Sequence, residues 1–189
     1  MLGLLSTLLR PTTGTVRFGE GAASDLGDDL RSRIGVLGHD LFLYGDLSAE
    51  ENLRFFGQLY NLDNLDALIT TALGAARLTE RTTDRVSGFS RGLRQRLALE
   101  RALLHQPRLV LLDEPFTGLD DESATLLADR LRGLREDGAI VLMATHDFDS
   151  ATGIVDRMIC LRNGRAREVD HRATGLRETY RAVMAEAWT

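Results

Sequence analysis

Several features that would place this chain in a simple class are missing from it. The one cysteine among 189 residues, Cys160, excludes an internal disulfide and suits a cytosolic protein. No apolar run approaches the roughly 18 residues of a transmembrane helix, so a role at a membrane would come through a partner subunit. The formal net charge of −5 lacks the basic surplus of a general nucleic-acid binder, so we expect no nucleic acid among the partners.

The most informative stretch that is present runs from Val86 to Asp121. Within it an uninterrupted apolar run, Leu109–Leu112, ends abruptly in Asp113 and Glu114. Such a run is typical of a strand buried on both faces of a parallel sheet, and ligands bind at the carboxyl ends of such strands. One carboxylate there can hold a magnesium ion, and the next can polarise an attacking water. The alternative interpretation is a strand-end acid pair that is merely solvated.

Four motifs together resemble the ATP-binding subunit of ABC transporters. Ser90-Arg91-Gly92 is similar to the core of the signature motif, Leu109–Glu114 to Walker B, and Gly118-Leu119-Asp120 to the D-loop. His146, after a second apolar run, is similar to the switch histidine. The motifs stand in family order at family spacing, and the resemblance extends over residues 1–168.

The resemblance implies an α/β fold, a partial RecA-like P-loop NTPase core with a mostly parallel sheet and an inserted all-helical subdomain. The insert is compact, which favours a transporter subunit over a DNA-organising ATPase with long coiled coils. We expect a truncated front of the core with the Q-loop strand, a helical subdomain ending in the signature motif, a core segment with Walker B, D-loop and switch histidine, and a C-terminal helix. These regions are residues 1–47, 48–92, 93–170 and 171–189.

Local patterns predict the elements that carry these motifs. Ser48-Ala-Glu-Glu51 is a capping box that begins a helix, and Asn163-Gly164 is the turn of a terminal hairpin. The other predicted elements are strands at 15–18, 34–37, 109–112 and 139–144, and helices at 65–77, 122–136 and 174–188.

The resemblance implies chemistry for three residues. Asp113 would hold Mg²⁺, and Glu114 would orient and deprotonate the water that attacks the γ-phosphate of ATP. His146 would contact that phosphate. A lone histidine after a buried strand is more often structural, and this is the alternative for His146.

The resemblance also implies nucleotide-binding roles for Ser90, Gly92, Asp120 and His39. Ser90 and Gly92 begin a helix whose amino terminus is a ready anion site, which in the family binds ATP held by the opposite subunit. An ordinary N-cap serine is compatible with the same position. The chain has F-S-R-G-L at 89–93 where the family has L-S-G-G-Q. His39 stands at the position of the Q-loop glutamine, and a loop histidine without nucleotide contact is the alternative.

The surroundings of His39 look similar to the haem-exporter branch of cytochrome c maturation, with parts shared by multidrug exporters. Aromatic and apolar side chains cluster in this part of the sequence. We interpret them as a mixture of core packing and a groove that receives a coupling helix of a membrane-spanning subunit. The cluster is Phe42, Leu43, Tyr44, Phe55 and Phe56.

One part of the family pattern is missing. The P-loop, G-x-x-x-x-G-K-[ST], which cradles the phosphates, occurs nowhere in the sequence. The chain starts with residues that follow this loop in the family, so we expect a front truncated inside the P-loop helix. Without the cradle, Asp113 and Glu114 would repel the phosphates, and we expect weak or absent ATP binding by the 189 residues alone.

Three functions therefore stay open. The first is an ATP-hydrolysing subunit that forms a homodimer or heterodimer on the cytoplasmic face of the cell membrane and energises export. The second is a non-catalytic module that lends Ser90 and Gly92 to the ATP of a complete partner. The third is a non-functional gene fragment, because a sheet without its front exposes an unpaired edge. A P-loop encoded upstream favours the first, co-purification with a complete ATPase the second, and aggregation the third.

Overall fold

A computed structural model describes residues 1–188, which form two compact units. The first unit is Met1–Ala144, and the second begins at Thr145. No helix in residues 1–188 has the length and apolar character needed to cross a membrane.

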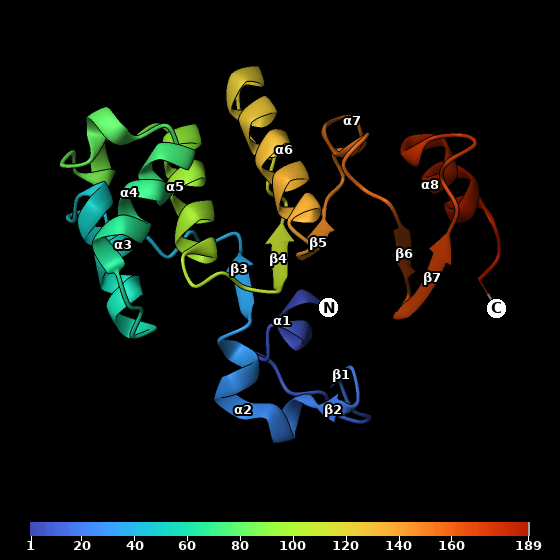
Figure 1. Cartoon of the computed structure of the whole chain (residues 1–189). Helices are drawn as coiled ribbons and strands as arrows, with labels where there is room; N and C mark the ends of the chain where they lie inside the picture. The colour runs from blue at the N-terminus through green and yellow to red at the C-terminus, as the bar shows by residue number, and fades with distance from the viewer. Residues whose placement is uncertain (189) are drawn as a thin grey trace. The chain divides into compact units, whose positions relative to one another are not determined.

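A parallel three-stranded sheet carries the acid pair of the first unit (Figure 1). β3 (Ile34–Leu37), β4 (Leu109–Asp113) and β5 (Ile140–Ala144) lie side by side in that order. In the register, Ile34 and Ile140 both pair with Leu109, from the two sides of β4. The prediction of a strand at 34–37 is confirmed, and the other two strands differ from their predicted bounds by one residue at one end.

β5 differs from the prediction in its surroundings. Its apolar sequence predicts burial on both faces, as found for the middle of β4. Ile140 is instead 66% exposed, and the other four residues of β5 are half-buried. β5 lies at the end of the described strand order and has a neighbouring strand on one side only. The expectation of a buried strand before His146 is therefore wrong.

Two helices pack on this sheet. α5 (Arg91–Leu103) lies against β3, and α6 (Asp121–Glu136) lies against β5 and α5. Gly35 permits the approach of α5, because a Cβ at this position would lie 2.5 Å from the Ala102 carbonyl oxygen and 2.8 Å from Pro107 Cγ. Any larger residue would force the helix away from the strand.

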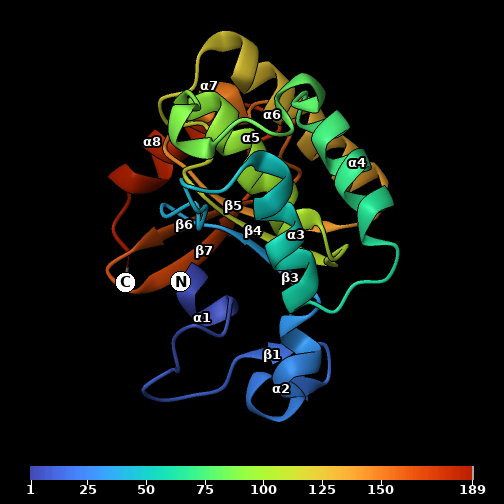
Figure 2. The ribbon, with the colours of Figure 1, turned by 90° about the vertical axis from the view of Figure 1, so that its left-hand side faces the viewer.

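The helical part of the first unit consists of α3 (Ala49–Leu59), α4 (Leu65–Ala75) and α5, with the 3₁₀ turns Thr79–Arg81 and Val86–Gly88 (Figure 2). The predicted capping box begins α3: Ser48 Oγ accepts from Glu51 N at 3.2 Å, and Glu51 Oε2 accepts from Ser48 N at 2.7 Å. One apolar core joins these helices. Its buried members include Leu53, Ile69, Leu73, Leu78, Phe89 and Leu97.

The amino-terminal part of the first unit, before β3, consists of short elements. These are α1 (Leu2–Leu5), the antiparallel pair β1 (Arg17–Phe18) and β2 (Gly21–Ala22), and α2 (Ala23–Arg31). The strand predicted at 15–18 is therefore present over its last two residues only. α2 bends at Gly27, whose φ of 50° and ψ of −129° are not helical.

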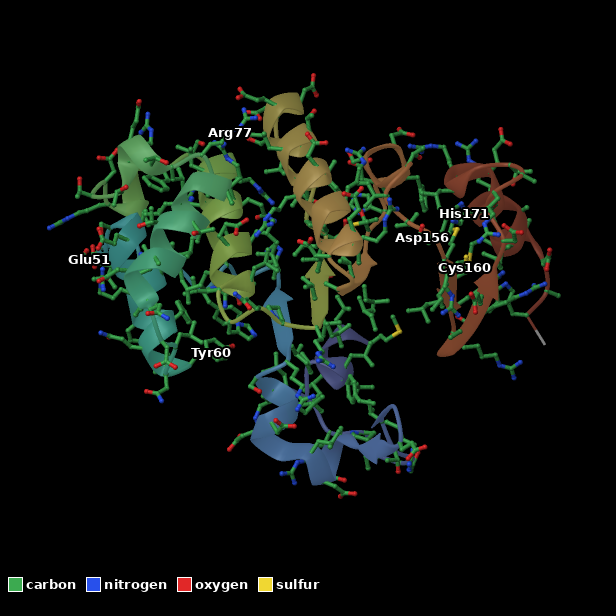
Figure 3. All side chains as sticks on the ribbon, in the orientation of Figure 1. Glu51, Tyr60, Arg77, Asp156, Cys160 and His171 are labelled. Carbon is green, nitrogen blue, oxygen red and sulfur yellow. The ribbon has the colours of Figure 1, made fainter. Side chains whose placement is uncertain are left out.

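The second unit contains α7 (Phe148–Ala151), the hairpin β6 (Met158–Arg162) and β7 (Arg165–Val169), and α8 (Leu176–Ala185). The predicted hairpin is confirmed, and both turn residues, Asn163 and Gly164, have the positive φ that a type I′ turn requires. Cys160 is buried on β6 (Figure 3). α8 packs on β6 and is shorter than the helix predicted at 174–188.

Candidate functional site

Asp113 and Glu114 lie at the carboxyl end of β4. Asp113 is exposed, and its backbone still pairs with Ala144 of β5. Glu114 has a φ of +48°, in a region that residues other than glycine rarely adopt. Its N–H donates to the Ala144 carbonyl oxygen at 2.8 Å, which ties this strained position to the end of β5. Strain at a carboxylate that ends a sheet strand is typical of a functional site.

A buried hydrogen bond joins the acid turn to α5. Gln95 Nε2 donates to the Pro115 carbonyl oxygen at 3.0 Å, and both residues are buried. The turn continues with the Thr117 N–H donating to the Glu114 carbonyl oxygen at 3.2 Å. The helix that begins at Ser90 and the acid pair therefore form one connected structure.

The predicted signature and D-loop segments meet in the same place. Ser90 is the N-cap of α5, and its Oγ accepts from Leu93 N at 3.3 Å, so the capping role is confirmed. A Cβ at Gly92 would lie 2.4 Å from Ser123 Oγ, so the amino-terminal ends of α5 and α6 touch there. Gly118 has a φ of +71°, and the Arg91 guanidinium lies across it, with Nε 2.9 Å from where a Cβ would stand.

Asp120 is the N-cap of α6. Its Oδ1 accepts from Ser123 N at 2.8 Å. The hydrogen bonds from Ser123 lower the pKa of the Asp120 carboxyl group, with a smaller contribution from the charge of Arg96. Asp120 is therefore a helix-capping anion that also holds Ser123 beside Gly92.

His39 lies in the loop after β3 and lines a cavity of about 660 Å³. Phe42 lines the same cavity, and Arg91, Arg94 and Gln95 line it from α5. The structure thus brings the predicted Q-loop residue and the start of the signature helix to one cavity.

His146 belongs to the second unit and is exposed. The next residue, Asp147, caps α7: its Oδ1 accepts from Ser150 N at 3.1 Å and its Oδ2 from Ser150 Oγ at 2.7 Å. These hydrogen bonds lower the pKa of the Asp147 carboxyl group. The catalytic role of His146 stays a prediction.

The donors present fit a magnesium ion only in part. No group of three or more His, Cys, Asp or Glu side chains within residues 1–188 could hold a metal ion. Magnesium in nucleotide sites uses one or two carboxylates together with phosphate oxygens, so exposed Asp113 suits such a shared site. All 23 basic residues among these 189 residues are arginine.

Two buried polar residues near this site were missed by the sequence analysis. Asn52 accepts from Tyr44 N at 2.8 Å and donates to the Tyr44 carbonyl oxygen at 3.0 Å, which fixes the loop after His39. Arg101 is 8% exposed in α5. Arg101 lies four residues after buried Leu97, so its position on the apolar face of the helix was a signal in the sequence.

Comparison with known proteins gives consistent similarities. The family model described as ABC transporter matches residues 1–117. The chain is 32% identical over 167 residues to the ABC transporter ATP-binding protein NatA of Bacillus subtilis (strain 168), covering 87% of this chain and 68% of that protein. It is 36% identical over 169 residues to the Nod factor export ATP-binding protein I of Rhizobium meliloti, covering 85% of this chain and 50% of that protein.

Solved structures are similar over most of the chain. An ATP-binding subunit of an ABC transporter matches with a TM-score of 0.83 and 26% identity, covering 97% of this chain and 81% of that chain. A dimeric bacterial ABC transporter cassette matches with a TM-score of 0.77 and 27% identity, covering 88% and 78%. These structures confirm the α/β fold predicted from the sequence. The names of the relatives given above do not mention haem or cytochrome c, and the haem-exporter assignment is not supported.

Proposed function

The chain belongs to the ABC transporter family, and we propose that it serves as the ATP-binding subunit of an exporter. In this function it would lie on the cytoplasmic face of the membrane and couple ATP hydrolysis to transport through a membrane-spanning partner. One observation carries the proposal. The acid pair after β4, the start of α5 and the turn before α6 are locked together through the Gln95–Pro115 hydrogen bond and the contact of Gly92 with Ser123.

The residues of this connected structure would divide the chemistry. Asp113 would hold Mg²⁺, which neutralises charge on the phosphates when bound. Glu114 would accept the proton of the attacking water, and its fixed backbone limits where its carboxylate can lie. Ser90 and Gly92 would bind the γ-phosphate of ATP held by a second subunit, because the free N–H groups at the start of α5 favour an anion.

His39, Asp120 and His146 would complete the nucleotide site. His39 can donate or accept a hydrogen bond and lies on the cavity that α5 also lines. Asp120 would stabilise the contact between the two helix ends. His146 would contact the γ-phosphate. Dimers of a cassette are known for a similar solved structure, which supports a homodimer or heterodimer here.

The exposed aromatic residues beside His39 would bind the membrane-spanning partner. Phe42 is 56% exposed and Tyr44 is 49% exposed. The Tyr44 ring packs edge-on against Phe55, with centroids 4.9 Å apart, and Phe55 packs against Phe56 at 5.2 Å. Tyr44 thus packs against another aromatic ring and stays partly exposed. Exposed rings of this kind can bind the apolar face of an amphipathic helix.

A second candidate function rests on Ser90 and Gly92 at the start of α5, which need no P-loop of their own. A chain without a P-loop lysine could lend Ser90 and Gly92 to ATP bound by a complete subunit, without hydrolysing ATP of its own. Mixing the 189-residue chain with a complete cassette tests this candidate. A rise in ATPase rate that Ser90→Ala abolishes would support it, and an unchanged rate would remove it.

The main proposal is tested by placing a P-loop segment, G-x-x-G-x-G-K-[ST]-[ST] with its preceding strand, in frame before Met1. We expect this protein to bind and hydrolyse MgATP. Glu114→Gln should keep ATP binding and slow hydrolysis by about 10²- to 10⁴-fold, the usual contribution of a general base. The matched control is Glu122→Gln, an exposed carboxylate in the first turn of α6, which should leave the rate unchanged.

Two results would contradict the main proposal. The first is a P-loop-bearing protein that folds but does not bind MgATP. The second is a Glu114→Gln variant that turns over as fast as Glu122→Gln, which would remove Glu114 from the role of base.

A further inference from the structure

A buried arginine without a counter-charge lies in the middle of the proposed machinery. Arg101 is 8% exposed, and no carboxylate within residues 1–188 forms an ion pair with it. Its Nε has no hydrogen-bond partner in the same part of the chain. Burial lowers the pKa of the guanidinium group. Arginine is rarely buried unless it is paired, so this side chain calls for a specific explanation.

The contacts of Arg101 connect three elements. Its Nη2 donates to the Val36 carbonyl oxygen of β3 at 2.9 Å. Its guanidinium carbon lies 5.0 Å from the centre of the Phe56 ring in α3 and 5.8 Å from the centre of the Phe42 ring. Both distances are within the range in which a cation is attracted to an aromatic face.

Phe42 lies in the loop that carries His39. It follows His39 by three residues and has a φ of +51°, a conformation that a bulky residue adopts only when its surroundings hold it. The next aromatic residue, Tyr44, packs against Phe55 and Phe56 and is bonded to Asn52. Arg101 therefore contacts Phe42 of this loop and also Phe56, against which Tyr44 of the loop packs.

We infer that Arg101 is a positioning residue, which holds the loop of His39 in register with the helix that begins at Ser90. α5 is continuous from Arg91 to Leu103, so Ser90 and Arg101 are about 16 Å apart along one uninterrupted helix. A displacement of the signature end is then transmitted to the loop through the guanidinium group. The functional importance of this positioning rests on the proposed function, but the contacts of Arg101 can be tested without nucleotide.

Amide hydrogen exchange on the 189-residue chain provides that test. Tyr44 N–H reports on the loop through its bond to Asn52, and Val110 N–H, in buried β4, reports on the whole first unit. We expect Arg101→Met to accelerate exchange at Tyr44 by at least about tenfold and to leave Val110 unchanged, because only the loop opens. The matched control is Arg132→Met, an arginine of α6 whose partner, Asp129, is exposed.

A conservative variant separates positioning from packing. Arg101→Lys keeps a cation over the two rings, and we expect exchange at Tyr44 within about threefold of the parent chain. If the lysine variant opens the loop as much as the methionine variant, the charge is not what holds the loop, and the inference is overturned. Unchanged exchange at Tyr44 in Arg101→Met, with Val110 still protected, overturns it as well.

If Arg101→Met unfolds the chain, a variant of Phe42 tests the same contact. Phe42 is more than half exposed, so Phe42→Leu removes the ring face without opening the core. We expect the same faster exchange at Tyr44 and no further acceleration when Arg101→Lys is added. Unchanged exchange in Phe42→Leu would overturn the inference.

The P-loop-bearing protein described above adds a functional readout. Arg101→Met should lower kcat, because the loop that carries His39 is no longer held in place beside α5. A raised KM with unchanged kcat would contradict a positioning role. If no variant hydrolyses ATP, the proposed function fails, while the exchange experiment still decides the role of Arg101.

Discussion

The two faces of α5 hold consecutive buried charges in opposite ways. On the face toward α6, Glu100 is 3% exposed and pairs with Arg130 through two bonds, Nε to Oε1 at 2.7 Å and Nη2 to Oε2 at 2.9 Å. On the face toward β3, Arg101 has no carboxylate within the described residues and meets a carbonyl oxygen and two ring faces. A bidentate ion pair fixes both distance and orientation, whereas ring faces accept a cation over a range of positions.

This difference indicates which contact of α5 is fixed and which can adjust. Burial raises the pKa of Glu100, an effect that the bonds from Arg130 offset in part, while the same bonds raise the pKa of Arg130. Neither buried charge is compensated without the other, so the pair joins α5 to α6. The contact of α5 with the loop of His39 links the two elements without fixing one orientation, because ring faces accept the cation over a range of positions.

Breaking the fixed contact should have the largest effect. Arg130→Ala leaves Glu100 buried without its partner, and we expect the free energy of unfolding to fall by about 3–5 kcal/mol in urea titrations. The control is Arg132→Ala in the same helix, whose ion pair with Asp129 at 2.6 Å is exposed and should contribute less than about 1 kcal/mol.

A double variant sharpens this prediction. Replacing both members, Glu100→Met with Arg130→Met, removes the buried charges together and should destabilise less than Arg130→Ala alone. Equal losses for Arg130→Ala and Arg132→Ala would show that the buried pair does not fix α5 to α6.

Where α5 packs on β3, the free energy of unfolding should be most sensitive to side-chain volume. Gly35→Ala places a methyl group 2.5 Å from the Ala102 carbonyl oxygen, and we expect overpacking to lower the free energy of unfolding by about 1–3 kcal/mol. Gly74→Ala in α4 is the control, because nothing lies within 4 Å of its Cβ position. That change should stabilise the chain by about 0.5–1 kcal/mol. A neutral Gly35→Ala would mean that α5 can shift freely on β3.

The parts of the fold that were predicted from the sequence are those fixed by local chemistry. The capping box of α3 and the Asn163-Gly164 turn need only their own residues, and both are found. α2 was missed because Gly27 interrupts its helical pattern. The exposure of β5 could not be predicted, because burial of a strand depends on neighbours that its own sequence does not specify.

The features of the candidate site also divide into those that the sequence predicted and those that it did not. The apolar run before Asp113 and Glu114 predicted their place at a strand end, since strand and acids are adjacent in sequence. The bond from Gln95 to Pro115 and the contacts of Arg101 join residues far apart in the chain, so composition and spacing could not reveal them. The chemical roles of the predicted site residues stay predictions until the ATPase variants are measured.

The smallest expected effect concerns the α6 end of the fixed contact, where Asp120 holds Ser123 beside Gly92. The hydrogen bonds from Ser123 lower the pKa of Asp120 in the folded chain. A lowered folded pKa contributes stability that is complete above the ordinary value of 3.8 and is lost as the pH falls through the folded value. Asp120→Asn keeps a capping oxygen that does not titrate.

We therefore expect the parent chain to be more stable than Asp120→Asn near neutral pH, and the difference to vanish on acidification below the folded pKa. Urea titrations of both proteins between pH 7 and strongly acidic pH measure this, and the shared titration of all other groups cancels in the difference. A difference that does not change with pH would show that the charge of Asp120 does not contribute. The contact of Gly92 with Ser123 would then depend on packing alone, as the close approach of α5 to Gly35 does.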